Sequence, residues 1–228
     1  MRRLLALSII SLCLATTAYG QTVDIIWQGE TYTPPFSKSR SLWSNQSKLT
    51  LWAVPQGASL SNSNYRWTKN GTVLGSLSGI GKNILTVNDT VLSKPQNIKV
   101  ELVSGDGNVL AESSALVTPI APNIVIYENN PLYGVMFHSE TVGSHVLKEN
   151  EVTFSAFPFF FTATNRSDNT LNYKWQTNTG GVETNPSVTY RATERSSGRA
   201  VVSASITNPV KILQTASKNF SVEFGGNE

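Results

Sequence analysis

Cysteine is almost absent from this sequence of 228 residues, in which Cys13 is the single one. It lies in the opening stretch MRRLLALSIISLCLATTAYG, where two arginines precede an apolar run and small residues. This pattern is typical of a secretory signal peptide over residues 1–20, cut before Gln21. A lipidation motif would need a small residue before the cysteine, where Leu12 stands. Cleavage would leave no cysteine, which excludes disulfides and thiol nucleophiles, so packing alone must stabilise a secreted or cell-surface protein.

Charge is also scarce, since only 14% of the residues are Asp, Glu, Lys or Arg. Removing Arg2 and Arg3 from the 18 basic side chains leaves 16 against 15 acidic ones, a net charge of +1. The remaining basic residues are scattered singly, so nucleic acid is not an expected partner. A second long apolar run is missing as well, and we expect no membrane span after signal cleavage.

Motifs for catalysis and cofactor binding are missing from the sequence. It has no G-x-S-x-G elbow, no phosphate loop and no dinucleotide fingerprint. His138 and His145, with Glu140 and Glu149, could be drawn as a metal site, but their spacing fits no known ligand pattern. Two solvated histidines in a loop are the simpler interpretation, and a hydrolase would need one of them beside a serine. Asp106 in SGDGN is read as a turn residue rather than a calcium ligand, so we expect no enzyme, metal or cofactor.

An internal repeat organises the rest of the chain. The strand-like LTLWAVP at 49–55 returns as VTFSAFP at 152–158, and NYRWTKNG at 64–71 returns as NYKWQTNT at 172–179. Apolar residues alternate in these strings, turn signals separate them, and no helical period of useful length appears. The pattern predicts an all-β protein of two tandem immunoglobulin-like antiparallel β-sandwiches. We place domain 1 at residues 21–118 and domain 2 at 119–228, joined near TPIAPN.

The repeated Tyr-x-Trp string predicts the centre of each core. An immunoglobulin-like sandwich packs one tryptophan of its third strand between the two sheets. Trp67 and Trp175 occur at equivalent places, each with a tyrosine two residues earlier, Tyr65 or Tyr173. Strand alternation puts each Tyr–Trp pair on one face, which favours core positions over a ligand platform. Other strand predictions are a hairpin over Asn97–Val117 and a last strand with Phe220, Val222 and Phe224 alternating.

Three further aromatic residues are candidates for a contact surface: Trp43, Trp52 and Phe160. Trp52 falls on the opposite face of its strand from the apolar alternation, and the Phe residues at 159–161 cannot all face one side. Outward aromatics either meet the neighbouring domain or mark an external partner. An apolar contact between the domains would make the pair stiff. A carbohydrate-binding module that uses Trp43 or Trp52 as a stacking platform is the alternative.

Two resemblances follow from these strings. YRWTKNG with SGIGKN resembles the third-strand region of PKD-type and other bacterial immunoglobulin-like domains, although FPFFF departs from the PKD pattern. The combination of WQGETYTPPF, YENNPLYG and LNYKW looks like uncharacterised secreted proteins of ultrasmall, reduced-genome bacteria, several of which occur among type IV pilus genes. That resemblance implies a non-enzymatic role in adhesion, scaffolding or pilus association at the cell surface. The implied partner is a protein, such as pilin, with a glycan as the alternative.

Overall fold

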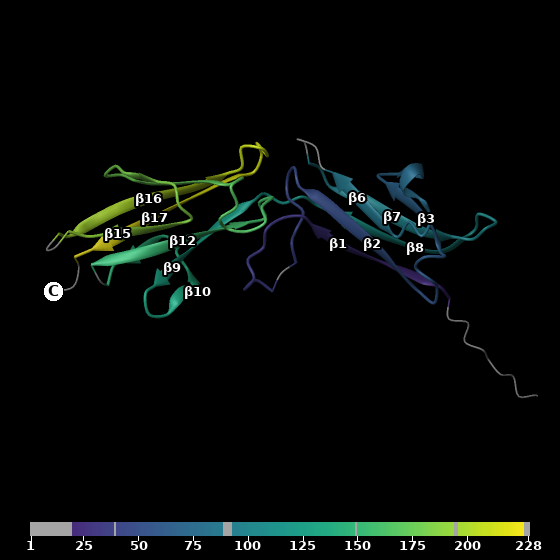
Figure 1. Cartoon of the computed structure of the whole chain (residues 1–228), viewed down its shortest axis with the longest axis horizontal. Helices are drawn as coiled ribbons and strands as arrows, with labels where there is room; N and C mark the ends of the chain where they lie inside the picture. Colours follow the sequence, from purple (N-terminus) through teal and green to yellow (C-terminus); the bar gives the residue numbers. More distant parts are fainter. Residues whose placement is uncertain (1–19, 39, 89–92, 149, 194–195, 226–228) are drawn as a thin grey trace, which may run out of the picture.

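The chain forms two β-rich halves arranged along one long axis, as Figure 1 shows. The structure is a computed structural model and describes residues 20–38, 40–88, 93–148, 150–193 and 196–225. We call the half built from β1–β8 domain 1 and the half built from β9–β17 domain 2. The predicted signal peptide and Cys13 lie outside the described residues, apart from Gly20.

Domain 1 has two facing antiparallel sheets. One sheet has the order β1-β2-β6 and consists of β1 (Thr22–Gly29), β2 (Lys48–Gln56) and β6 (Ile84–Asn88). The other has the order β4-β3-β7-β8, with β5 also paired to β3; it consists of β3 (Asn64–Lys69), β4 (Thr72–Val73), β5 (Gly79–Ile80), β7 (Gln96–Val103) and β8 (Val109–Val117). A short 3-10 turn, Gly75–Leu77, lies between β4 and β5. The strand order is that of an immunoglobulin-like sandwich.

Domain 2 repeats this plan with two additions. Its first sheet has the order β10-β9-β12-β15, with β9 (Asn123–Asn130), β10 (Gly134–Glu140), β12 (Glu151–Phe159) and β15 (Ser187–Arg191). Its second has the order β11-β17-β16-β13-β14, with β11 (Ser144–Val146), β13 (Asn172–Thr177), β14 (Val182–Glu183), β16 (Gly198–Thr207) and β17 (Thr215–Phe224). The additions are β10 and β11, and β11 pairs with β17 in parallel. The fold is therefore two tandem immunoglobulin-like β-sandwiches.

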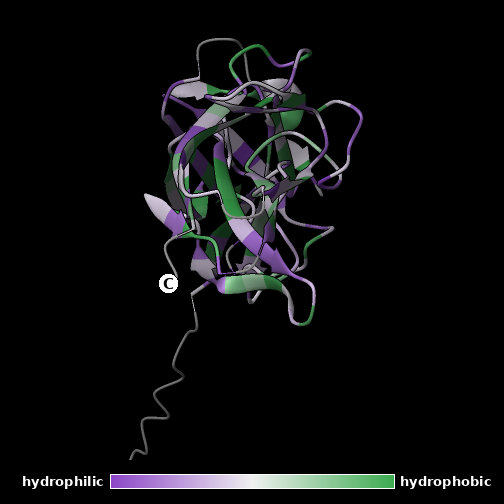
Figure 2. Ribbon diagram, turned by 90° about the vertical axis from the view of Figure 1, so that its left-hand side faces the viewer, coloured by the Kyte–Doolittle hydropathy of each residue, from purple (hydrophilic) through white to green (hydrophobic). Residues whose placement is uncertain are grey.

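Each domain has its own apolar core. In domain 1 the inward residues of β2, namely Leu49, Leu51 and Ala53, are all completely buried. In domain 2 the matching residues of β12 are Val152, Phe154 and Ala156. Burying one such large side chain contributes about 1.5–3 kcal/mol, which is how a chain without disulfides can stay folded. Figure 2, a view along the long axis, shows hydrophobic and hydrophilic stretches on the strands of the sandwich.

The observed strands test several predictions made from the sequence. The hairpin over Asn97–Val117 is confirmed as β7 and β8, and the Gly107 N–H donates to the Ser104 carbonyl (3.0 Å) in its turn beside Asp106. The last strand is confirmed as β17. The loop assignment for the histidine segment is wrong, because β10 and β11 run through it. The histidine spacing carries no signal for these pairings: β10 pairs with the preceding strand β9, and β11 pairs with the distant strand β17.

Candidate functional site

The four residues predicted for the cores occupy equivalent places in the two domains. Trp67 and Trp175 are 0% and 1% exposed, and Tyr65 and Tyr173 are 0% and 5% exposed. Each tyrosine hydroxyl donates to a carbonyl of the loop before its strand, that of Leu60 (3.0 Å) or Arg166 (2.6 Å). Burial raises the pKa of both tyrosines, so the hydroxyls stay protonated donors. These residues form the centres of the two cores, and neither indole is exposed as a stacking platform on the outer surface.

Trp43 requires a correction. The sequence suggested a contact surface, but the side chain is completely buried in the core of domain 1. Its Nε1–H donates to the Ser47 carbonyl (3.2 Å), so the polar edge of the indole is satisfied inside the protein. The residue comes from the loop between β1 and β2, which folds back over the core. A buried ring cannot stack on a sugar, and the platform loses one of its two candidate tryptophans.

Trp52 lies half-buried on the outer face of the β1-β2-β6 sheet. Its cross-strand neighbours are Ile26 on β1 and Ile84 on β6. These isoleucines are 57% and 50% exposed. An apolar row of three side chains therefore crosses this sheet, with the indole in its middle.

Phe160 contributes to the junction between the domains through its backbone. Its N–H donates to the Tyr32 carbonyl (2.9 Å), and the Tyr32 N–H donates back to the Phe161 carbonyl (2.7 Å). The buried Ser44 hydroxyl donates to the Phe160 carbonyl (2.6 Å). Phe160 has a φ of 63°, in the left-handed region, and this turn sends the ring of Phe161 into the core of domain 2. The sequence left open whether these aromatics meet a domain or a partner, and the backbone here meets domain 1.

Gln214 adds a second set of bonds across the junction. It is 1% exposed. Its Nε2 donates to the Asn45 carbonyl and to the Thr162 hydroxyl, both at 2.8 Å. Its Oε1 accepts from the Thr162 N–H (2.7 Å). A single buried amide thus joins the loop between β1 and β2 of domain 1 to two loops of domain 2.

An aromatic cluster completes the junction. Phe36 of domain 1 stacks on Phe137 of β10, with ring centroids 3.8 Å apart. It also makes edge contacts with the rings of Tyr127, Phe157 and Phe159. Edge-to-face pairs of this kind are each worth about 0.5–1.5 kcal/mol beyond their buried area. The register of β10 against β9 shifts between Val135 and Glu140, and this irregular segment carries Phe137.

The linker is fixed to domain 1 as well. Ile120 forms an isolated parallel bridge with Ser44, and its N–H donates to the Trp43 carbonyl (2.9 Å). The chain therefore has contacts from its linker, its polar loops and its aromatic residues that set one domain against the other. The sequence carries no periodic signal that identifies the junction residues Tyr32, Phe36, Ser44 and Gln214.

The two histidines differ in their exposure and in their neighbours. His138 is exposed on β10. His145 is half-buried on β11, with its Nε2 3.8 Å from Glu128 Oε2 and its ring edge-on to Phe154. Burial lowers the pKa of His145, and the Glu128 carboxylate opposes that shift. Glu149 lies outside the described residues. Among the described residues, no three His, Cys, Asp or Glu side chains gather closely enough to hold a metal ion.

Comparisons with known proteins return structural neighbours only. No family model matches the chain, and no curated protein matches it. The three N-terminal domains of the Highly Immunogenic Outer Capsid protein of bacteriophage RB49 align with 18% identity over 90% of this chain, at a TM-score of 0.46. This chain spans 59% of that structure.

The N-terminal Ig1-2 module of the Drosophila receptor protein tyrosine phosphatase DLAR aligns at 13% identity, over 89% of this chain and 98% of its own, with a TM-score of 0.28. Sidekick-1 immunoglobulin domains 1–4 align at 12% identity, over 89% and 66%, with a TM-score of 0.25. Because these TM-scores are low, the fold assignment rests on the sheets of this chain. By strand order and core, the chain belongs to the class of tandem immunoglobulin-like sandwiches. No helix in the described part of the chain is long and apolar enough to cross a membrane.

Proposed function

We propose that this chain is a non-enzymatic interaction module that presents one braced apolar hairpin to a protein partner. The hairpin joins β9 to β10 and projects from domain 2 (Figure 1). At its tip Leu132 is 85% exposed and Tyr133 is 77% exposed. Tyrosine is among the residues that most often carry the binding energy of protein interfaces, and the exposed Leu132 beside it extends the apolar surface.

The tip is held in one shape by its own polar contacts. The Asn130 Oδ1 accepts hydrogen bonds from the N–H groups of Leu132 (2.9 Å) and Tyr133 (3.3 Å). Such an Asx turn fixes the backbone without using other parts of the protein. Preorganised anchors lose less entropy on binding, which favours affinity.

The observation that carries the proposal is the stacking of Phe36 on Phe137. It braces the base of the hairpin against domain 1, so the tip has a defined position relative to both domains. A stiff pair with a protruding apolar tip suits adhesion or scaffolding. The sugar platform is less well supported, because Trp43 is buried and Trp52 stands without a second exposed indole beside it.

The finer parts of the proposal rest on the sequence. Secretion or cell-surface location is supported by the signal-like residues 1–20, and the domain limits at 21–118 and 119–228 by the internal repeat. Pilus association, with pilin as the partner, is supported by the resemblance to secreted proteins encoded among type IV pilus genes.

A crosslinking pull-down with the chain from Gln21 onward, on intact cells of the source organism, tests this proposal. We expect a specific protein to be recovered, and the double variant Leu132→Ser, Tyr133→Ser to recover about tenfold less. Leu116→Ser is the matched control, because Leu116 is 70% exposed on β8 of domain 1. Equal recovery by the double variant and the wild type would overturn the role of the tip, and recovery of glycan alone would replace the protein partner.

A further inference from the structure

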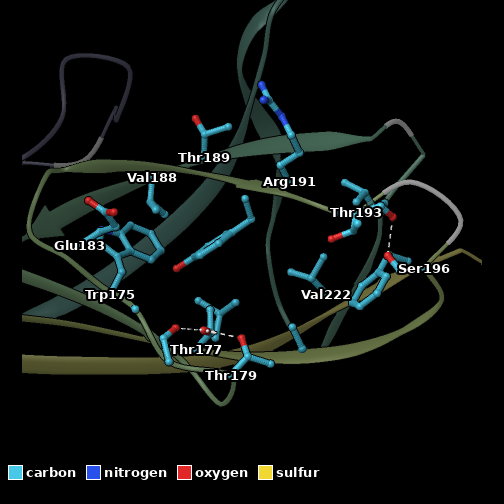
Figure 3. Close-up of a pocket in the computed structure, with 18 residues that line it drawn as sticks. Trp175, Thr177, Thr179, Glu183, Val188, Thr189, Arg191, Thr193, Ser196 and Val222 are labelled. Atoms are coloured by element: carbon cyan, nitrogen blue, oxygen red, sulfur yellow. Dashed lines mark hydrogen bonds between the residues drawn. The ribbon is translucent and has the colours of Figure 1, made fainter.

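Domain 2 contains a cavity of about 480 Å³ between its two sheets. Small-molecule sites usually enclose about 300–1,000 Å³. The apolar wall includes Trp175, Val188 and Val222, while Glu183 and Thr177 lie toward the β13-β14 turn (Figure 3). The cavity is separate from the hairpin tip, so its use does not depend on the function proposed above.

A comparison of the two domains explains why the cavity exists. In domain 1 the residue opposite Trp67 is Leu74, whose N–H donates to the Trp67 carbonyl (2.8 Å) and whose side chain packs against the core. In domain 2 the residue opposite Trp175 is Glu183. Its side chain is exposed, because a carboxylate is too costly to bury in an apolar core. The space that leucine fills in one copy is therefore left open in the other.

A second difference between the domains places the hydroxyl of Tyr190 at the same cavity. Val87 is the cross-strand partner of Leu49 in domain 1, and Tyr190 is the partner of Val152 in domain 2. The Tyr190 hydroxyl is buried and has no hydrogen-bond partner among the described residues. Burial raises the pKa of Tyr190 to about 12, so the group stays a neutral phenol. A buried hydroxyl without a partner is uncommon in folded proteins, because the hydrogen bonds that it makes to water in the unfolded chain are not replaced.

The charged residues around the cavity indicate the sign of the charge that a ligand would carry. In the described part of the chain, the Glu183 side chain forms no hydrogen bond or ion pair. Arg191, the basic residue of the lining, is already engaged, since its Nε and Nη2 donate to Glu151 Oε2 at 3.0 and 2.6 Å. Figure 3 shows the Arg191 guanidinium directed away from Glu183. Among the described residues that line the cavity, the charge without a partner is therefore the negative charge of Glu183, which favours a cation.

We propose that this cavity of domain 2 binds small organic amines that carry an apolar body. The apolar body lies against Val188 and Val222. The ammonium group donates hydrogen bonds to the Glu183 carboxylate and to the hydroxyl oxygen of Tyr190. The contact that Tyr190 lacks in the free protein is then made by the ligand.

Titration calorimetry with the chain from Gln21 onward tests the proposal with three probes that share one body. Phenethylamine, phenethyl alcohol and hydrocinnamate carry a cationic, a neutral and an anionic head. We expect the amine to bind about tenfold more tightly than the alcohol, and the acid not to bind, because Glu183 repels it. No saturable binding of the amine at millimolar concentration, or equal affinity for all three heads, would overturn the proposal.

Variants at Glu183 and Tyr190 separate the contributions of the carboxylate and the hydroxyl to amine binding. Glu183→Gln should lose about tenfold in affinity for the amine and keep its affinity for the alcohol. Glu183→Leu restores the leucine of domain 1 and should abolish binding of both, with an unfolding midpoint at or above that of the wild type. Tyr190→Phe keeps the ring and should weaken the amine more than the alcohol. Glu112→Gln, at an exposed position on β8, is the control; undiminished binding by Glu183→Leu would place the amine elsewhere.

Discussion

The indole nitrogens of Trp67 and Trp175 donate hydrogen bonds of the same length, 2.8 Å, to carbonyls at corresponding points of the two domains. The acceptors are Lys82, two residues before β6 begins, and Asn185, two residues before β15 begins. Each bond ties the third strand of a sandwich to the loop that enters the opposite sheet. The two copies thus share a buried polar contact as well as a pattern of apolar residues.

Replacing either indole by phenylalanine should cost similar amounts of stability. Trp67→Phe and Trp175→Phe each leave a carbonyl without its donor and a small void, at about 1–3 kcal/mol. Urea unfolding followed by circular dichroism measures the loss. Trp52→Phe is the control, since Trp52 lies half-buried on an outer face, and we expect its cost to stay below about 1 kcal/mol. A loss confined to one of the two core variants would contradict their equivalence.

Removing the Gln214 side chain should loosen the junction without unfolding either domain. Gln214→Ala breaks the bonds to Asn45 and Thr162 and leaves their polar groups buried. Residual dipolar couplings, which report the relative orientation of the domains, should then fit one alignment tensor poorly. Gln176→Ala, at an exposed position on β13, should behave as the wild type does. If Gln214→Ala keeps a single tensor, the amide is not needed for stiffness.

The left-handed backbone of Phe160 predicts an unusual order of stability between two small substitutions. An L-residue with a side chain costs about 1–2 kcal/mol in this conformation, whereas glycine adopts it freely. Both substitutions lose the ring contact with Phe159 to the same extent. We therefore expect Phe160→Gly to unfold at a higher urea concentration than Phe160→Ala, opposite to the order expected within an ordinary strand.

Asp168 makes domain 2 sensitive to acid. Its carboxylate accepts hydrogen bonds from the N–H and hydroxyl groups of Thr164 and Thr170, which hold its pKa well below the usual 3.8. Because the folded pKa is depressed, this stabilisation is fully present above pH 3.8 and is lost as the pH falls through the folded pKa. Asp168→Asn should lose stability of the order of 1 kcal/mol at neutral pH. Its unfolding free energy should also fall less steeply than that of the wild type under acid, as urea titrations over the acid range would show.

The features that could be predicted from the sequence are those that depend on a local pattern of residues. Alternation around Leu49, Leu51 and Phe220 places strands, and a repeated Tyr-x-Trp string places two core tryptophans. The junction depends instead on residues far apart in the chain, such as Ser44 with the carbonyl of Phe160. Trp43 shows the same limit, because a loop that folds back over a core has no periodic signature. The cavity in domain 2 could not be predicted because it depends on β-sheet register. That register places Glu183 opposite Trp175, whereas Leu74 lies opposite Trp67 in domain 1.

The junction uses a segment of domain 1 that domain 2 does not reproduce. Residues 30–47, between β1 and β2, supply Tyr32, Phe36 and Ser44, whereas the corresponding stretch of domain 2 forms β10 and β11. A further sandwich could not dock onto domain 2 by the same contacts. The tandem is therefore a directional pair with unlike ends, and its geometry cannot be propagated into a chain of identical steps.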